Sequence, residues 1–116
     1  MTLREKQSAF AFALANFITW IFNEGCEVTL SEGYVGDTDA ADGDYDGPHK
    51  QGGQHYLKLA QDINLFIDGK LITNAEHPAW KMLGRRWKQM DSLARWGGDW
   101  SSGDANHFSF EHEGKA

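Results

Sequence analysis

The segment Trp96–Phe110, with the sequence WGGDWSSGDANHFSF, is the part of the chain from which the fold is best worked out. Its last residues alternate between polar and aromatic, which is typical of a strand with one buried face, so we expect a strand from about Asn106 to Glu111. A histidine three residues after an acid, His107 after Asp104, predicts a metal ligand at the edge of this strand, with a carboxylate beside whatever the metal activates. One motif supplies too few ligands, so the others must come from earlier in the chain.

Size, charge and cysteine content limit the classes of protein that fit. The chain has 116 residues, of which 41% are hydrophobic and five are tryptophan, enough for the core of one domain spanning 1–116. A net charge of -6 argues against a nucleic-acid binder that uses a basic surface. Cys26 is the only cysteine, which excludes an internal disulfide and a zinc site built from several cysteines. Any metal must therefore be bound by histidine and carboxylate side chains.

The apolar segment from Phe10 to Phe22 has two interpretations. It resembles the centre of a signal peptide, and it also fits an amphipathic helix. We favour a helix from Leu3 to Asn23, because Thr2 and Glu5 match a capping box and the apolar residues recur at helical spacing. No segment reaches the roughly 20 apolar residues that a membrane-spanning helix needs, so we expect no membrane span.

The remaining elements predict an α+β fold with a small antiparallel sheet and two helices, one amino-terminal and one central. A strand that resumes at His55 should end at an Asp68-Gly69 hairpin turn. Tryptophans on the second helix are interpreted as core residues. The expected elements are strands at Glu27–Ser31, His55–Ile67 and Lys70–Ile72, and a helix that opens at Pro78 and carries Trp80, Leu83, Trp87, Met90 and Ala94 on one face.

His55 and Asp62 are the upstream candidates for metal ligands. Seven residues of straight strand span roughly 23 Å, so these two side chains can meet only if the chain bends or loops between them. Together with His107 they give two histidines and one carboxylate. Catalytic zinc sites use this ligand class and leave one position open for water.

At these residues the chain resembles the M15 family of zinc metallopeptidases, which includes D-Ala-D-Ala carboxypeptidases and phage L-alanyl–D-glutamate endolysins. The family pattern Ser-x-His-x-x-Gly-x-Ala-x-Asp is matched at His55, Ala60 and Asp62. The closing pattern, Trp-Gly-Gly-Asp-Trp followed by Asp-x-x-His-Phe, is matched in full at 96–100 and 104–108. The resemblance extends from about Gly53 to Phe110, with looser agreement in the amino-terminal helix and strand.

The resemblance implies an activity and a role for each matched residue. It implies that His55, Asp62 and His107 bind zinc, and that Asp104 is the general base for a zinc-bound water. The implied function is that of a phage-type endolysin that hydrolyses a stem-peptide bond of peptidoglycan, and the bond expected from the resemblance is L-Ala–D-Glu. It would be a monomer in the cytoplasm of the infected bacterial host before lysis, and would then act on the cell wall. The alternatives are a D-Ala-D-Ala carboxypeptidase or dipeptidase and a non-catalytic, metal-stabilised cell-wall-binding module.

The chain departs from the family pattern at several positions. Gly53 stands where the family usually has serine, and Lys58 stands where it has glycine. The arginine that many members carry after the first strand is missing, and Val35 lies near its place. Lys58 could supply the absent positive charge, although we favour a solvated lysine.

An acidic segment offers a second candidate metal site. Asp42, Asp44 and Asp46 fit the opening of a calcium loop, but Gly53 occupies the position of the terminal bidentate glutamate. A solvated acidic loop between Gly36 and Gly53 is the alternative. The three remaining histidines are interpreted as surface residues: His49, His77 and His112.

Overall fold

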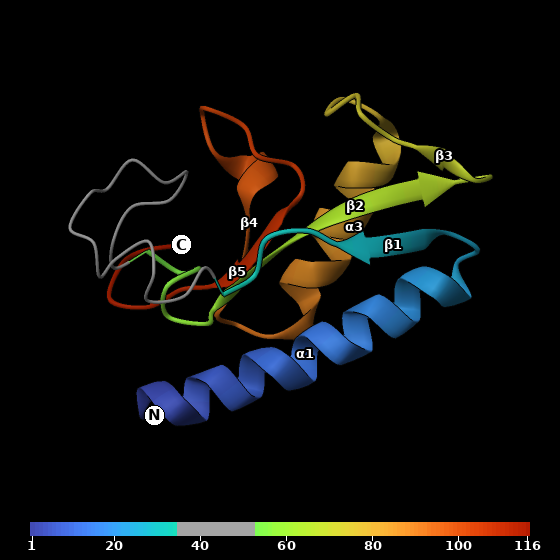
Figure 1. The fold of residues 1–116 in the computed structure, drawn as a ribbon. Helices are drawn as coiled ribbons and strands as arrows, with labels where there is room; N and C mark the ends of the chain where they lie inside the picture. The colour runs from blue at the N-terminus through green and yellow to red at the C-terminus, as the bar shows by residue number, and fades with distance from the viewer. Residues whose placement is uncertain (35–52) are drawn as a thin grey trace.

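The computed structural model describes residues 1–34 and 53–116, and within them it confirms an α+β fold with two helices and an antiparallel sheet (Figure 1). The elements in chain order are α1 (Leu3–Asn23), β1 (Glu27–Leu30), β2 (Ala60–Ile67), β3 (Lys70–Leu71), α3 (Pro78–Met90), β4 (Ala94–Trp96), a short 3-10 helix (Gly97–Asp99) and β5 (His107–Phe110).

Helix α1 begins and ends as the sequence predicts. The Thr2 hydroxyl accepts a hydrogen bond from the Glu5 amide, and the Glu5 carboxylate accepts one from the Thr2 amide. Past the last turn, Gly25 has a φ of +85°, a left-handed conformation that favours glycine. The helix buries a stripe of side chains that belong to the core: Phe10, Ala13, Phe17 and Ile21. None of the helices in the described part of the chain is long and apolar enough to cross a membrane.

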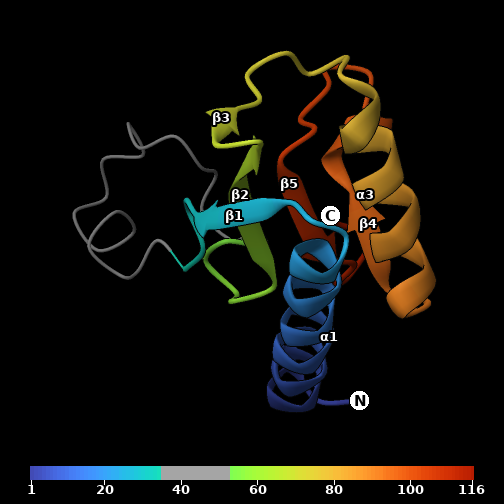
Figure 2. The same cartoon turned by 90° about the vertical axis from the view of Figure 1, so that its right-hand side faces the viewer.

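The five strands form one antiparallel sheet in the order β1-β2-β5-β4, with β3 also paired to β2. Both helices pack on one face of the sheet (Figure 2). On that face Phe108 contacts Phe17 of α1, with ring centroids 4.9 Å apart, and Phe110 lies 5.7 Å from Trp87 of α3. Because side chains alternate along a strand, the neighbouring residue His107 points to the opposite face.

Two element boundaries differ from the sequence-based prediction by more than one residue, and backbone conformation explains both. Strand β2 begins at Ala60 instead of His55, because residues 54–58 form a turn in which Lys58 has a φ of +58°. Helix α3 ends at Met90, because Asp91 is fully extended. Ala94 is therefore not on the helix and lies in β4. The predicted core tryptophans are confirmed, since Trp80 and Trp87 are both buried.

Candidate metal centre

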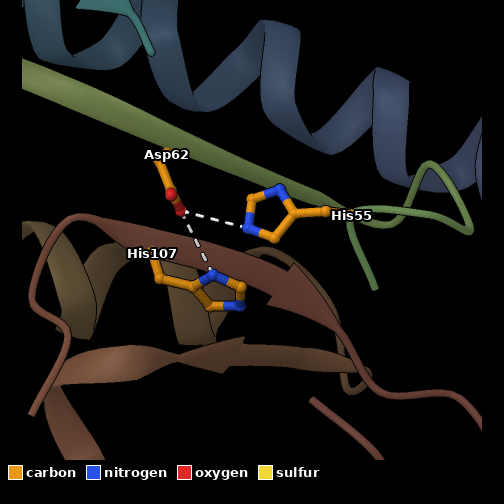
Figure 3. Close-up of side chains that lie close together, drawn as sticks. All are labelled: His55, Asp62 and His107. Carbon is orange, nitrogen blue, oxygen red and sulfur yellow. Dashed lines mark hydrogen bonds and ion pairs between the residues drawn. The ribbon is translucent and has the colours of Figure 1, made fainter. Parts of the chain in front are cut away.

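Strand pairing brings two of the three predicted ligands together. Asp62 of β2 is the register partner of His107, the first residue of β5. Directly opposite residues in an antiparallel pair have neighbouring side chains on the same face. The Nδ1 atom of His107 lies 3.2 Å from Oδ1 of Asp62 (Figure 3).

A tight turn brings the third residue, His55, back over β2. The amides of Tyr56 and Leu59 donate to the carbonyls of Gly53 and Gln54, at 3.0 and 2.8 Å. The chain therefore curls before β2 begins, which is the bend that a meeting of His55 with Asp62 requires. The Nε2 atom of His55 lies 3.4 Å from Asp62 Oδ1 (Figure 3).

Backbone oxygens fix which nitrogen of each imidazole carries the proton. Nδ1 of His55 lies 2.8 Å from the Gly33 carbonyl oxygen, and Nε2 of His107 lies 3.0 Å from the Ala116 oxygen. An oxygen of this kind only accepts, so each of these nitrogens must donate. The other nitrogen of each ring, Nε2 of His55 and Nδ1 of His107, then directs a lone pair toward Asp62 in the neutral ring. Two lone pairs that face a carboxylate require a proton or a metal cation between them.

The three side chains are nearly closed off from solvent, and their charges are coupled. Both histidine side chains are 5% exposed and Asp62 is 13% exposed. Burial alone raises the pKa of Asp62, but hydrogen bonds from His107 and His55 and their charge lower it to about 2. Burial alone lowers the pKa of His55, but the hydrogen bond to Asp62, the Gly33 carbonyl and nearby acids together raise it. The cluster therefore favours the charged forms of both Asp62 and His55.

The donor spacing fits a metal ion. One donor atom from each of the three residues lies within 4.8 Å of the other two. In a tetrahedral site with metal–ligand bonds of 2.0–2.1 Å, neighbouring donors are about 3.3–3.4 Å apart. The distances from Asp62 Oδ1 to the two histidine nitrogens, 3.2 and 3.4 Å, agree with that edge. This group can hold a metal ion.

The Trp-Gly-Gly-Asp-Trp motif sets the position of the loop that leads to His107. The carbonyl of Gly97 accepts from the amide of Asp104 at 2.9 Å, and the Asp104 carbonyl accepts from the amide of His107 at 3.1 Å. A methyl group at position 97 would approach the Asp104 oxygen to 2.2 Å. Only glycine permits this contact, so the motif determines where the candidate base and the third ligand lie.

Four residues that the sequence interpretation did not single out complete the surroundings of the trio. Gly33 and Ala116 supply the backbone oxygens described above, and the Ser109 hydroxyl donates to the same Ala116 oxygen at 2.9 Å. The Trp100 ring packs beside the His107 ring at 4.7 Å between centroids. Backbone oxygens cannot be recognised in a sequence. Trp100 lies inside the closing motif and Ser109 follows that motif directly, so both could have drawn attention.

The side chain of Lys58, the departure from the family glycine, contacts a residue outside the trio. Its side chain is exposed, and its ammonium lies 4.9 Å from the centroid of the Tyr34 ring. This agrees with a solvated lysine and gives no support to Lys58 as a substitute for the absent arginine.

The other candidate residues lie elsewhere. His77 accepts a hydrogen bond from the Ala79 amide at the start of α3, and His112 lies 3.0 Å from the Lys6 ammonium. Both are half-buried instead of fully exposed, and each has a structural contact. The proposed calcium ligands Asp42, Asp44 and Asp46, together with His49 and Val35, lie outside the described residues.

Comparison with known proteins identifies no relative: the chain matches no protein-family model and no curated protein. The chemical interpretation of the site therefore depends on the geometry of its own residues and on the resemblance of its two motifs.

Proposed function

We propose that the chain is a zinc-dependent peptidoglycan peptidase of the phage endolysin type, which hydrolyses a peptide bond in the stem peptide. The observation that supports this most strongly is the trio itself. Asp62 Oδ1 lies 3.4 Å from His55 Nε2 and 3.2 Å from His107 Nδ1, one donor atom from each of the three residues lies within 4.8 Å of the others, and both tautomers are set by backbone oxygens. The bond expected first from the resemblance is L-Ala–D-Glu, with D-Ala–D-Ala as the alternative.

Zinc fits this donor set better than calcium or magnesium does. Two imidazoles and one carboxylate form a typical catalytic zinc set, whereas calcium and magnesium prefer oxygen ligands alone. When bound by three protein ligands, zinc lowers the pKa of water from 15.7 toward about 7 and polarises a carbonyl group.

Asp104 is the residue of this chain that we assign to proton transfer. It precedes His107 by one turn, is half-buried, and does not belong to the ligand trio found among the described residues. As general base, its carboxylate accepts a proton from the attacking water and later delivers it to the leaving amine. The backbone hydrogen bonds to Gly97 and His107 hold it beside the third ligand.

Metal analysis and peptide mass spectrometry of purified peptidoglycan digests test this proposal. The parental protein should bind one zinc per chain and release stem-peptide fragments that a chelator abolishes. His107→Ala should lose the zinc, whereas His77→Asn should keep it, because asparagine also caps a helix and His77 lies outside the trio.

Asp104→Asn separates the enzyme from a metal-stabilised binding module. The variant should keep one zinc per chain, because the ligands are unchanged, and cleavage should fall by at least about 10²-fold. A zinc-loaded parental protein that cuts no stem peptide, or an Asp104→Asn protein that cuts at the parental rate, contradicts the proposed mechanism.

A further inference from the structure

A pocket of about 330 Å³ lies beside the candidate base and is not explained by the metal trio. Its walls come from β2, from β3 and the loop that follows it, from α3 and from the loop before β5. In Figure 1 the two loops rise on the side of β2 opposite to α1. Asp104 is one of the lining residues, so the pocket and the proposed proton-transfer group share a wall.

The pocket lies along β2 from the metal trio. Asn64, which is two residues after Asp62 and therefore on the same face of β2, lines the pocket together with Asn106, the residue before His107. Two residues of strand span about 6.7 Å. A peptide residue next to a scissile bond at the trio therefore lies close enough to direct its side chain into the pocket.

The position of Asp104 decides which side of the scissile bond enters the pocket. A general base that becomes the general acid must lie next to the leaving amine. A pocket that has Asp104 as one wall consequently faces the residue whose amine is released.

The chemistry of the walls decides what kind of side chain fits. Aliphatic and aromatic groups from Ile63, Ile72 and Trp80 meet polar side chains from Asn64 and Thr73. Asp104 is the one charged residue among those that line the pocket in the described part of the chain. Among the described lining residues, an acidic side chain placed here meets a carboxylate and no cationic side chain, whereas a short aliphatic side chain contacts apolar walls.

We propose that this pocket is the subsite for the amine-side residue of the substrate and that it selects a short, uncharged side chain over an acidic one. The proposal rests on the proposed peptidase function for its role in catalysis. A substrate with an acidic residue such as D-Glu on the amine side of the scissile bond should therefore be cleaved poorly. The family resemblance implies the opposite preference, with L-Ala–D-Glu as the first bond and D-Ala–D-Ala as the alternative.

Two matched peptides test the selectivity directly: acetyl-L-Ala–D-Ala-amide and acetyl-L-Ala–D-Glu-amide, which differ only in the amine-side side chain. The zinc-loaded protein should cleave the alanine peptide with a kcat/KM at least about tenfold higher. Ala75→Trp fills the pocket from its exposed rim and should reduce cleavage of the alanine peptide about tenfold without loss of zinc. Ala15→Trp, on the exposed face of α1, is the matched control and should leave cleavage unchanged. Equal cleavage of both peptides, or no effect of Ala75→Trp, overturns the subsite.

A binding experiment separates failure of the subsite from failure of the peptidase function. Acetyl-D-Ala-amide should shift the backbone amide resonances of Asn64, Thr73 and Asn106 at millimolar concentration, and acetyl-D-Glu-amide should shift them less. Ala75→Trp should abolish the response. If these shifts occur but no stem peptide is cleaved, the subsite is supported and the peptidase function fails. If the shifts are absent, the subsite is wrong whatever the activity.

Discussion

Gly97→Ala is the substitution that tests most directly how the motif around Gly97 builds the metal centre. An added Cβ would lie 2.2 Å from the Asp104 carbonyl oxygen and 2.9 Å from the Cβ of His107. Ordinary contact begins at 3.4 Å, so the loop carrying Asp104 must move by about 1.2 Å, and His107 follows because its amide donates to the same carbonyl. Overpacking of this kind costs roughly 1–3 kcal/mol of stability.

The consequences for metal binding and catalysis are larger than the loss of stability. A shift of about 1 Å at a catalytic group can cost about 10² in rate, and a disturbed ligand shell typically costs about 10–100-fold in metal affinity. Competition with a chromophoric zinc chelator measures the affinity, and circular dichroism verifies the fold. Gly103→Ala is the matched control, because it strains a glycine with φ +70° in the same loop but meets no atom within 4 Å. A folded Gly97→Ala protein with parental zinc affinity refutes this account of the motif.

Three further predictions concern the backbone, the supporting hydrogen bonds and the protonation state. Lys58→Gly should raise the free energy of unfolding, measured by denaturant titration, by roughly 0.5–1 kcal/mol. The substitution removes the backbone strain of a lysine at φ +58°, and the larger conformational entropy of glycine in the unfolded chain offsets only part of this stabilisation. Ser109→Ala removes the hydroxyl that holds the Ala116 oxygen against His107, so zinc affinity should fall about tenfold, while exposed Ser101→Ala leaves it unchanged. The pKa of His55 is raised above its ordinary 6.5, so the stabilisation from its protonated form is present in full below pH 6.5 and is lost as pH rises through the raised pKa. The thermal midpoint of the metal-free protein should therefore fall as pH rises over that range. The zinc affinity should rise over the same range, because zinc no longer competes with a proton. If the thermal midpoint and the zinc affinity change in the same direction with pH, this coupling is wrong.

The sequence by itself determined the local elements and the identities of the ligand candidates. The capping box at Thr2 and Glu5 and the glycine after the last turn set the ends of α1, because both act within a few residues of chain. The Asp68-Gly69 turn joins β2 to β3 for the same reason, since both of its residues have positive φ. The two motifs selected His55, Asp62 and His107 before any geometry was known, and the structure brings these residues together.

Only the tertiary structure decided the geometry that makes the trio a metal site. The separation of His55 from Asp62 predicted that the chain bends between them, but not at which residue. The turn places Lys58 in the left-handed conformation, which lysine disfavours, so the sequence does not indicate a turn there. The register that places Asp62 opposite His107 joins residues 45 apart in the chain, and no local pattern encodes such a pairing. The tautomers of the two histidines depend on the oxygens of Gly33 and Ala116, which every residue type carries, so sequence cannot reveal them. The chemistry of the ligand side chains can therefore be predicted from the sequence, whereas the direction of each histidine lone pair is determined by the fold.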